Sequence, residues 1–148
     1  MTAIRPSTPA DTERLHAIWL ASVKATHHFL APADLEFFSR LVRDEYLPKA
    51  SLWVAIDDNH QPVAFLGATG NQLDALFTHP SSFGRGIGRA LIRHAFPPGV
   101  EITLEVNEAN TQARAFYAKL GLREIGRSEL DGTGKPYPLI QMAGIPEH

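Results

Sequence analysis

Alternating glycines mark the most distinctive segment of the chain, HPSSFGRGIGRALI at residues 79–92. Its glycines are Gly84, Gly86 and Gly88, and its arginines are Arg85 and Arg89. The apolar run that follows predicts that a helix begins here. A helix start presents about four backbone N–H groups without partners and a partial positive charge. Because glycine lets a ligand approach the backbone closely, the segment predicts an anion site of the phosphate-binding kind.

Two familiar phosphate motifs do not fit this segment. A dinucleotide fingerprint needs G-x-G-x-x-G, and counted from Gly84 the third glycine position holds Arg89. A Walker A loop needs Gly-Lys-Ser/Thr, which the segment lacks. A diphosphate site of another type and a flexible turn without a ligand remain. An ordered glycine costs roughly 0.5–1 kcal/mol relative to alanine, which favours the site over the idle turn.

Composition excludes several other classes of protein. The 148 residues contain no cysteine, which removes disulfides, thiolate metal ligands and a cysteine nucleophile. The seven histidines show no H-E-x-x-H or comparable spacing, so we expect no metal cofactor. A net charge of −2 argues against nucleic acid, and no apolar run approaches the roughly 20 residues of a membrane span. The first residues lack the apolar core of a signal peptide, so we expect a cytoplasmic protein.

Apolar periodicity predicts the elements that must position the glycine segment. Strands are expected at 3–8, 51–57, 62–70, 72–80, 100–107, 122–130 and 137–145, and helices at 9–30, 31–48 and 110–121, with one more helix that follows the glycine segment and ends before Pro97. The last helix has an asparagine and a glycine at the positions of its N-cap and C-cap. This order predicts a single α/β domain over residues 1–148. Its mixed, partly antiparallel sheet would have about six to seven strands flanked by about four helices, with one strand–helix–strand crossover in the second half.

The glycine segment resembles a known cofactor site. Residues 77–92, FTHPSSFGRGIGRALI, resemble the acetyl-CoA-binding segment of the GNAT acyltransferases, whose pattern is Gln/Arg-x-x-Gly-x-Gly/Ala. The two glycines of that pattern are Gly86 and Gly88, while its Gln/Arg position holds Phe83. The departure removes a polar side chain beside the pyrophosphate, and the backbone amides of residues 84–89 remain to bind it.

A second segment resembles the same family. Residues 106–122, VNEANTQARAFYAKLGL, resemble the family pattern N-x-x-A-x-x-x-Y-x-K-x-G-F, with Leu122 in place of the final Phe. The matching residues are Asn110, Ala113, Tyr117, Lys119 and Gly121. The order of elements is also that of the family, so the resemblance covers most of the chain. Three further segments, IWLASVKATHHFL, LDALF and GKPYPL, resemble the YjaB-type branch of bacterial GNAT proteins.

The resemblance implies acetyl transfer from acetyl-CoA to a primary amine. That amine would belong to a protein lysine, a protein N-terminus or a small molecule. Tyr117 would be the general acid that reprotonates the leaving thiolate, whereas its helix pattern alone favours a core tyrosine. The absence of cysteine excludes an acetyl-cysteine intermediate, so we expect direct attack within a ternary complex, with a serine ester still open.

Candidates for the general base come from the strand before the glycine segment and from the strand that follows it in the chain. Strand alternation places Gln72 and Asp74 on one face of residues 72–80. The resemblance puts the family's glutamate base at Gln72, and Asp74 is the next residue on that face. We therefore take Asp74 as the catalytic candidate, against the alternative of an ordinary polar edge residue. Glu105 and Asn107, near the end of the next strand, are further candidates.

The resemblance also implies a set of ligand-contacting residues. Backbone groups of the strand would pair with the pantetheine arm as an added strand does. The expected cofactor-binding residues are Leu76, Phe77, Thr78, Gly84, Arg85, Gly86, Ile87, Gly88, Arg89, Asn110 and Tyr117. The expected acceptor-binding residues are His27, His28 and Asn107, although paired histidines at a helix end are also typical of capping or solvated groups. Family members are often dimers, which leaves a homodimer open.

Two other functions fit the same residues. A non-catalytic acetyl-CoA sensor would keep the cofactor site and lose the chemistry, and the role of Tyr117 separates it from the enzyme. A binding module for a different phosphate ligand would bind ATP or NAD without binding CoA.

Overall fold

The computed structural model describes residues 2–147, and residues 1 and 148 lie outside this range. The chain forms two compact units, which we call the N-terminal unit (Met1–Gly67 with Ala75–Ala95) and the C-terminal unit (Ala68–Asp74 with Phe96–His148). The expectation of one domain over residues 1–148 stays a prediction. None of the helices among the described residues is long and apolar enough to cross a membrane.

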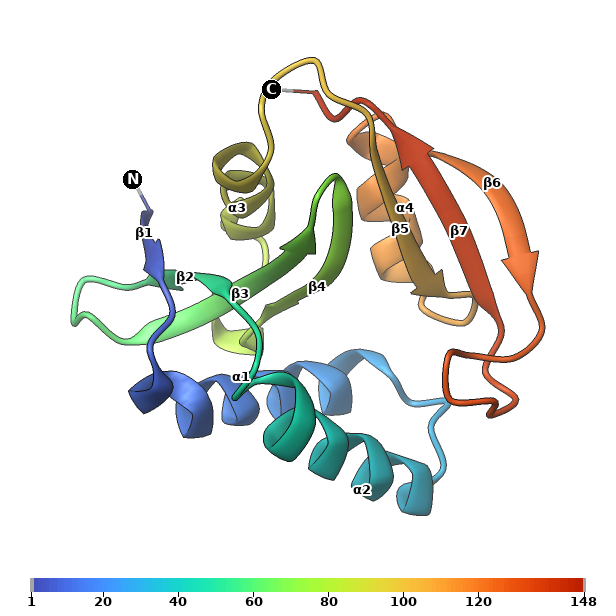
Figure 1. Ribbon diagram of the computed structural model, residues 1–148, viewed down its shortest axis with the longest axis horizontal. Helices are drawn as coiled ribbons and strands as arrows, with labels where there is room; N and C mark the ends of the chain where they lie inside the picture. Colours follow the sequence, from blue (N-terminus) through green and yellow to red (C-terminus); the bar gives the residue numbers. More distant parts are fainter. Residues whose placement is uncertain (1, 148) are drawn as a thin grey trace. The chain divides into compact units, whose positions relative to one another are not determined.

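The elements follow the expected order (Figure 1). Within residues 2–147, four α-helices and seven strands follow one another in this order: β1 (Ala3–Pro6), α1 (Thr12–Thr26), α2 (Pro32–Leu41), β2 (Leu52–Ile56), β3 (Pro62–Thr69), β4 (Gln72–Thr78), α3 (Ile87–Ala95), β5 (Ile102–Asn107), α4 (Thr111–Lys119), β6 (Arg123–Ser128) and β7 (Leu139–Gly144). Strand pairing gives the order β1-β2-β3-β4-β5-β7-β6. The mixed, largely antiparallel sheet confirms the expected fold class.

The N-terminal unit packs helices on both faces of its strands. β2 pairs antiparallel with β1 and with β3. Alternate residues of β2 point to opposite faces. Leu52 and Val54 join a buried cluster with α1, and each such fully buried side chain contributes about 1.5–3 kcal/mol. Trp53 points the other way, where its ring meets His94 of α3 at 4.4 Å between centroids.

The second helix differs from the sequence expectation. A single helix was expected over residues 31–48, but α2 ends at Leu41 and a π-helical turn, Val42–Tyr46, continues from it to the stop at Pro48. The side chain of Tyr46 occupies the space that a Cβ on Gly67 of β3 would need. Packing against the strand thus accompanies the change in helical period, a non-local contact that helical spacing alone does not reveal.

In the C-terminal unit, β7 pairs antiparallel with both β5 and β6. The start of β4 pairs parallel with β5, at Gln72↔Thr103 and Leu73↔Leu104, which confirms the expected crossover through α3. The C-terminal strand is therefore inserted between two strands that precede it in sequence. This insertion makes β6 an edge strand, and it was not foreseen from the order of the elements.

Both ends of α4 are capped as expected. Asn110 Oδ1 accepts a hydrogen bond from the Ala113 amide at 3.1 Å, which is an N-cap. At the other end Gly121 has φ +106°. The amide of Leu122 donates to the Tyr117 carbonyl and that of Gly121 to the Ala118 carbonyl, both at 3.1 Å, which is the Schellman pattern. These two caps fix the frame of the helix that carries Tyr117.

Candidate active site

The glycine segment forms a loop before α3 in which two glycines have a left-handed backbone. Gly84 and Gly86 have φ values of +76° and +75°, a region that side chains with a Cβ rarely adopt. A Cβ at either position would meet nothing within 4 Å, so the backbone angle and not crowding requires glycine there. Gly88 lies inside α3 with no positive φ. Two of the three alternating glycines are therefore required by a left-handed backbone angle, and the third is an ordinary position within the helix.

The backbone N–H groups of this loop are free. The first hydrogen bond of α3 runs from the Ala90 amide to the Gly86 carbonyl at 3.0 Å. Among residues 2–147, no acceptor lies within hydrogen-bond distance of the amides from Gly84 to Arg89. A run of unpaired donors at a helix start is suited to a diphosphate, which offers several oxygens and negative charge. The loop thus fits the pyrophosphate of CoA by the chemistry of its donors.

Arginine side chains add charge at the same place. Arg85 is exposed and Arg89 half-exposed, and neither guanidinium has a hydrogen-bond or ion-pair partner in the described part of the chain. Arg93 was not among the expected site residues; it lies one helical turn after Arg89 and likewise has no partner within residues 2–147. Its spacing of four residues from Arg89 was the signal available in the sequence.

The strand before the loop supplies backbone groups rather than side chains. Ala75 and Phe77 point into the buried cluster below α1, as strand alternation predicted. The Phe77 ring packs edge-on against Trp19 and beside Phe65, with centroids 6.4 and 5.6 Å apart. The half-buried side chain of Phe77 therefore packs against the core, and its main chain is the part suited to pair with an extended ligand.

Tyr117 is the central candidate in the C-terminal unit. Its ring is buried, with 8 % of the residue exposed, and packs against Phe116. Its hydroxyl has no hydrogen-bond partner among residues 2–147, yet no buried side-chain oxygen or nitrogen in that range is left unsatisfied. The hydroxyl therefore reaches accessible space. Burial raises the pKa of Tyr117 above its usual value, so the phenol stays protonated and is available as a donor.

Two asparagines precede this helix. The Asn107 carbonyl, at the end of β5, accepts the Asn110 amide at 3.0 Å. The Oδ1 atom of Asn110 is used in the N-cap. Its side-chain NH₂ group remains available to donate to a ligand. Asn110 thus has a structural role that is compatible with the expected binding role.

Asp74 lies where the turn after β3 enters β4. It is exposed, and its Oδ2 accepts the Thr69 hydroxyl at 2.5 Å. This bond bridges the two sides of the hairpin and is the kind of contact an ordinary edge residue makes. Oδ1 remains free to accept a proton, so the catalytic role of Asp74 stays a prediction.

His27 occupies the C-cap of α1 in the N-terminal unit. The Thr26 hydroxyl donates to the Ser22 carbonyl at 2.8 Å, so its one proton is used. The 2.7 Å contact between Thr26 Oγ1 and His27 Nδ1 must then be a bond that Nδ1–H donates, which leaves Nε2 as an acceptor. Burial and the neighbouring His28 lower the pKa of His27 to about 4, so the ring is neutral at pH 7. His28 is exposed.

The expected site residues therefore divide between the two units. The N-terminal unit holds the end of β4, the glycine loop and the two histidines, and the C-terminal unit holds Asp74, Asn107, Asn110 and Tyr117. The contact that sequence reasoning missed is the hydrogen bond from His27 to Thr26, whose direction depends on the geometry of the helix end. Among the described residues, no cluster of histidine, aspartate and glutamate could hold a metal ion.

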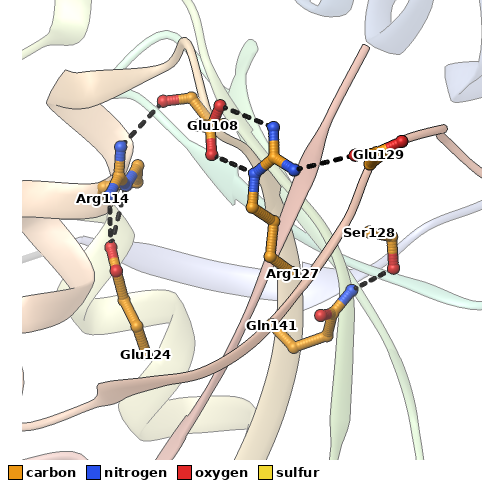
Figure 2. Close-up of polar contacts among 7 residues, drawn as sticks. All are labelled: Glu108, Arg114, Glu124, Arg127, Ser128, Glu129 and Gln141. Atoms are coloured by element: carbon orange, nitrogen blue, oxygen red, sulfur yellow. Dashed lines mark hydrogen bonds and ion pairs between the residues drawn. The ribbon is translucent and has the colours of Figure 1, made fainter. Parts of the chain in front are cut away.

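A cluster of polar side chains in the C-terminal unit is internally satisfied (Figure 2). Arg114 donates to Glu124 at 2.6 Å and to the Glu108 carbonyl at 2.9 Å. Arg127 holds the Glu108 carboxylate through two of its nitrogens, at 2.5 and 3.2 Å. This cluster binds α4 and β6 together, and its charges are paired.

Comparison with known proteins settles the family. A family model described as "Acetyltransferase (GNAT) domain" matches residues 48–124, which include the glycine loop and α4. The chain belongs to the GNAT acetyltransferase family. It is an N-acetyltransferase, and acetyltransferases of this fold use acetyl-CoA.

Relatives extend the match over nearly the whole chain. The chain is 48% identical to the peptidyl-lysine N-acetyltransferase YjaB of Salmonella typhimurium, over 96% of this GNAT chain and 97% of that protein. The solution structure of the apo form of YjaB from Escherichia coli superposes with a TM-score of 0.92 at 45% identity, covering 99% of each chain. The Thermoplasma acidophilum PaiA N-acetyltransferase in complex with coenzyme A shares the fold, with a TM-score of 0.78 at 20% identity over 98% of this chain and 99% of that chain. These matches confirm the resemblance found in the sequence, including its YjaB-type branch.

Proposed function

We propose that this GNAT enzyme transfers an acetyl group directly from acetyl-CoA to the side-chain amine of a protein lysine, within a ternary complex. The observation that carries the proposal is the run of unpaired N–H groups from Gly84 to Arg89. The acceptor class is supported by the relatives of 47–48% identity, which are named peptidyl-lysine N-acetyltransferases. Cytoplasmic location and a homodimer stay predictions of the sequence.

The N-terminal unit would hold the cofactor. Amides of the loop would bind the diphosphate, with Arg85 and Arg89 adding charge. Main-chain groups of Leu76, Phe77 and Thr78 would pair with the pantetheine arm, and in the C-terminal unit the Asn110 amide group would donate to the cofactor. Acetyl-CoA supplies an activated thioester, and the residues of the chain orient it and manage the protons.

Tyr117 would act as the general acid. A thiol has a pKa near 8.5 and a tyrosine one near 10, which burial raises further in Tyr117. Complete proton transfer from Tyr117 to the leaving thiolate is therefore uphill by more than about 2 kcal/mol. The main contribution of Oη is the hydrogen bond that it donates to the developing negative charge, and the proton follows as the thiol leaves.

Asp74 would be the base for the acceptor. A lysine amine has a pKa near 10.4, so it must lose a proton before it can attack a thioester. The free Oδ1 of Asp74 would take this proton directly or through water. His27, neutral at pH 7 and with Nε2 open, would accept a hydrogen bond from the amine, alongside His28 and Asn107.

Release of free thiol from acetyl-CoA tests the activity. The acceptor is a peptide with a blocked N-terminus and a single lysine, compared with the same peptide carrying arginine in its place. We expect thiol release with the lysine peptide only. Spermidine, free amino acids and aminoglycosides complete the acceptor screen, and release with these amines alone would replace the protein lysine as acceptor.

Removal of the Tyr117 hydroxyl tests the proposed mechanism. Tyr117→Phe is expected to lower kcat by about 10²- to 10⁴-fold and to leave CoA affinity, measured by calorimetry, within twofold. Tyr46→Phe, which removes a hydroxyl from the π-helical turn, serves as the matched control and keeps full turnover. Unchanged turnover in Tyr117→Phe removes Tyr117 from the acid role. CoA binding without transfer to any acceptor instead identifies a sensor.

A further inference from the structure

The arginines of α3 and its loop differ from all the others in the chain. Every other arginine has an acceptor: Arg5 at Asp11, Arg14 at the Pro62 carbonyl, Arg40 at Glu36, Arg43 at Asp44, Arg114 at Glu124, Arg123 at Glu101 and Arg127 at Glu108. Arg85, Arg89 and Arg93 have none among residues 2–147. Their separation in sequence is four residues each time, so Arg89 and Arg93 lie on the same face of α3.

No carboxylate of residues 2–147 lies within ion-pair distance of these side chains. The sequence contains no aspartate or glutamate between Asp74 and Glu101. The buried residues of α3 are Ile87, Leu91 and Ile92, which turn Arg89 and Arg93 toward solvent. Two like charges four residues apart on a helix repel each other, and Arg89 lies in the first turn, where the helix dipole disfavours a cation. An anionic ligand would offset both effects.

The proposed cofactor carries more negative charge than the loop alone would bind. The diphosphate of CoA uses the free amides with Arg85 and Arg89. The ribose carries a second, separate phosphate on its 3′ oxygen, and only the sugar ring separates it from the diphosphate. Arg93 lies one turn beyond Arg89, roughly 6 Å along the axis, on the same exposed face. We propose that Arg93 recognises the 3′-phosphate of CoA and makes the enzyme select CoA over 3′-dephospho-CoA.

This proposal rests on the proposed function and adds a specificity-determining residue to it. A 3′-phosphate is a monoester dianion, and a guanidinium binds such a group through paired N–H donors. Because Arg93 is exposed, we expect a modest preference, about three- to tenfold in affinity. Screening should reduce that preference as salt rises from about 0.05 to 0.5 M.

Calorimetry with CoA and with 3′-dephospho-CoA tests the proposal. The variants are Arg93→Gln, Arg93→Lys and, as matched control, Arg123→Gln on β6, whose contact with Glu101 is a loose 3.9 Å. The wild type should bind CoA more tightly than 3′-dephospho-CoA. Arg93→Gln should remove the preference by weakening CoA alone, Arg93→Lys should keep part of it, and Arg123→Gln should keep it whole.

The ratio of the two affinities is measured within each variant, so a loss of folded protein affects both ligands alike and cancels. Equal binding of both ligands by the wild type overturns the proposal, and so does an equal loss of both in Arg93→Gln. Either result leaves the proposed function standing, since CoA still binds. If neither ligand binds the wild type, this proposal and the proposed function fall together.

Discussion

Arginine serves two different purposes in two regions of this protein. In the polar cluster of the C-terminal unit, Arg114 and Arg127 each hold a glutamate at hydrogen-bond distance (Figure 2). In the loop and helix from Gly84 to Arg93, neither the guanidinium groups nor the first backbone amides have a partner among the residues that the structure describes. The same side chain therefore joins elements where a carboxylate is built in opposite it, and remains available to a ligand where none is.

The two regions also differ in backbone. The helix of the paired region, α4, has both of its ends capped, through Asn110 and Gly121. The helix of the unpaired region begins after a loop with two positive φ values and keeps its first donors open. Capping satisfies donors from within the chain, whereas the glycine loop leaves them for a bound anion. Substitutions in the two regions should accordingly change different measured quantities.

Glycine substitutions are expected to show the largest difference between the two regions in their effects on CoA binding. Gly86→Ala and Gly134→Ala both place a Cβ at positive φ, +75° and +83°, with nothing within 4 Å. Each should cost about 1–2 kcal/mol of unfolding free energy. Only Gly86→Ala should also weaken CoA, by tenfold or more in calorimetry, because it redirects the loop amides. A comparable loss of CoA binding in Gly134→Ala would show that the loop is not special.

Arginine substitutions should have smaller effects, and a variant from one region should lose CoA affinity while a variant from the other loses stability. Arg89→Gln removes an unpaired charge, so we expect CoA affinity to fall about three- to tenfold while the free energy of unfolding stays unchanged or rises slightly. Arg114→Gln breaks bonds to Glu124 and to the Glu108 carbonyl. It should lower the free energy of unfolding by about 1 kcal/mol in urea titration and leave CoA affinity alone. If both variants lose stability equally, the proposed distinction between the regions is wrong.

The smallest effect concerns the ion pair of the N-terminal unit. The hydrogen bonds from Arg5, more than those from Thr8, lower the pKa of Asp11 to about 2 from an ordinary 3.8. A lowered pKa stabilises the fold above the unfolded value, and this contribution is lost as the pH falls from about 4 to 2. Since Arg5 is partly exposed, we expect about 1 kcal/mol. Urea titrations at pH 6 and pH 2.5 should show that acid costs Asp11→Asn less stability than wild type, and equal losses would contradict the assignment.

Local signals in the sequence were enough for much of the fold. The order of strands and helices, the caps of α4 and the glycine loop all depend on residues within a few positions of each other, and the structure confirms them. The match to the GNAT family rests on the same two segments. The length of the second helix was not predictable in this way, because the π-helical turn accompanies the packing of Tyr46 beside Gly67, about twenty residues further along the chain.

Site roles were harder to predict for the same reason. The sequence placed Phe77 among the cofactor contacts, and its backbone keeps that role in the proposal, but its half-buried ring packs against Trp19 and Phe65 of the core. Nothing in the sequence around Asp74 revealed the bond from Thr69, and nothing around His27 revealed which nitrogen carries the proton. These properties follow from atoms brought together by folding.

The amino-acid sequence by itself determined the order of the strands and helices, the caps of α4, and which residues match the acetyltransferase family. Helix periodicity, capping and backbone sterics act over four or five residues, so they can be read along the chain. Only the tertiary structure decided that β7 lies between β5 and β6. It also decided that Arg114 and Arg127 are paired, while Arg85, Arg89 and Arg93 have no partner in the described range 2–147. Whether two charged side chains form an ion pair depends on the distance between them in space. That distance is fixed only when strands and helices remote in sequence have packed.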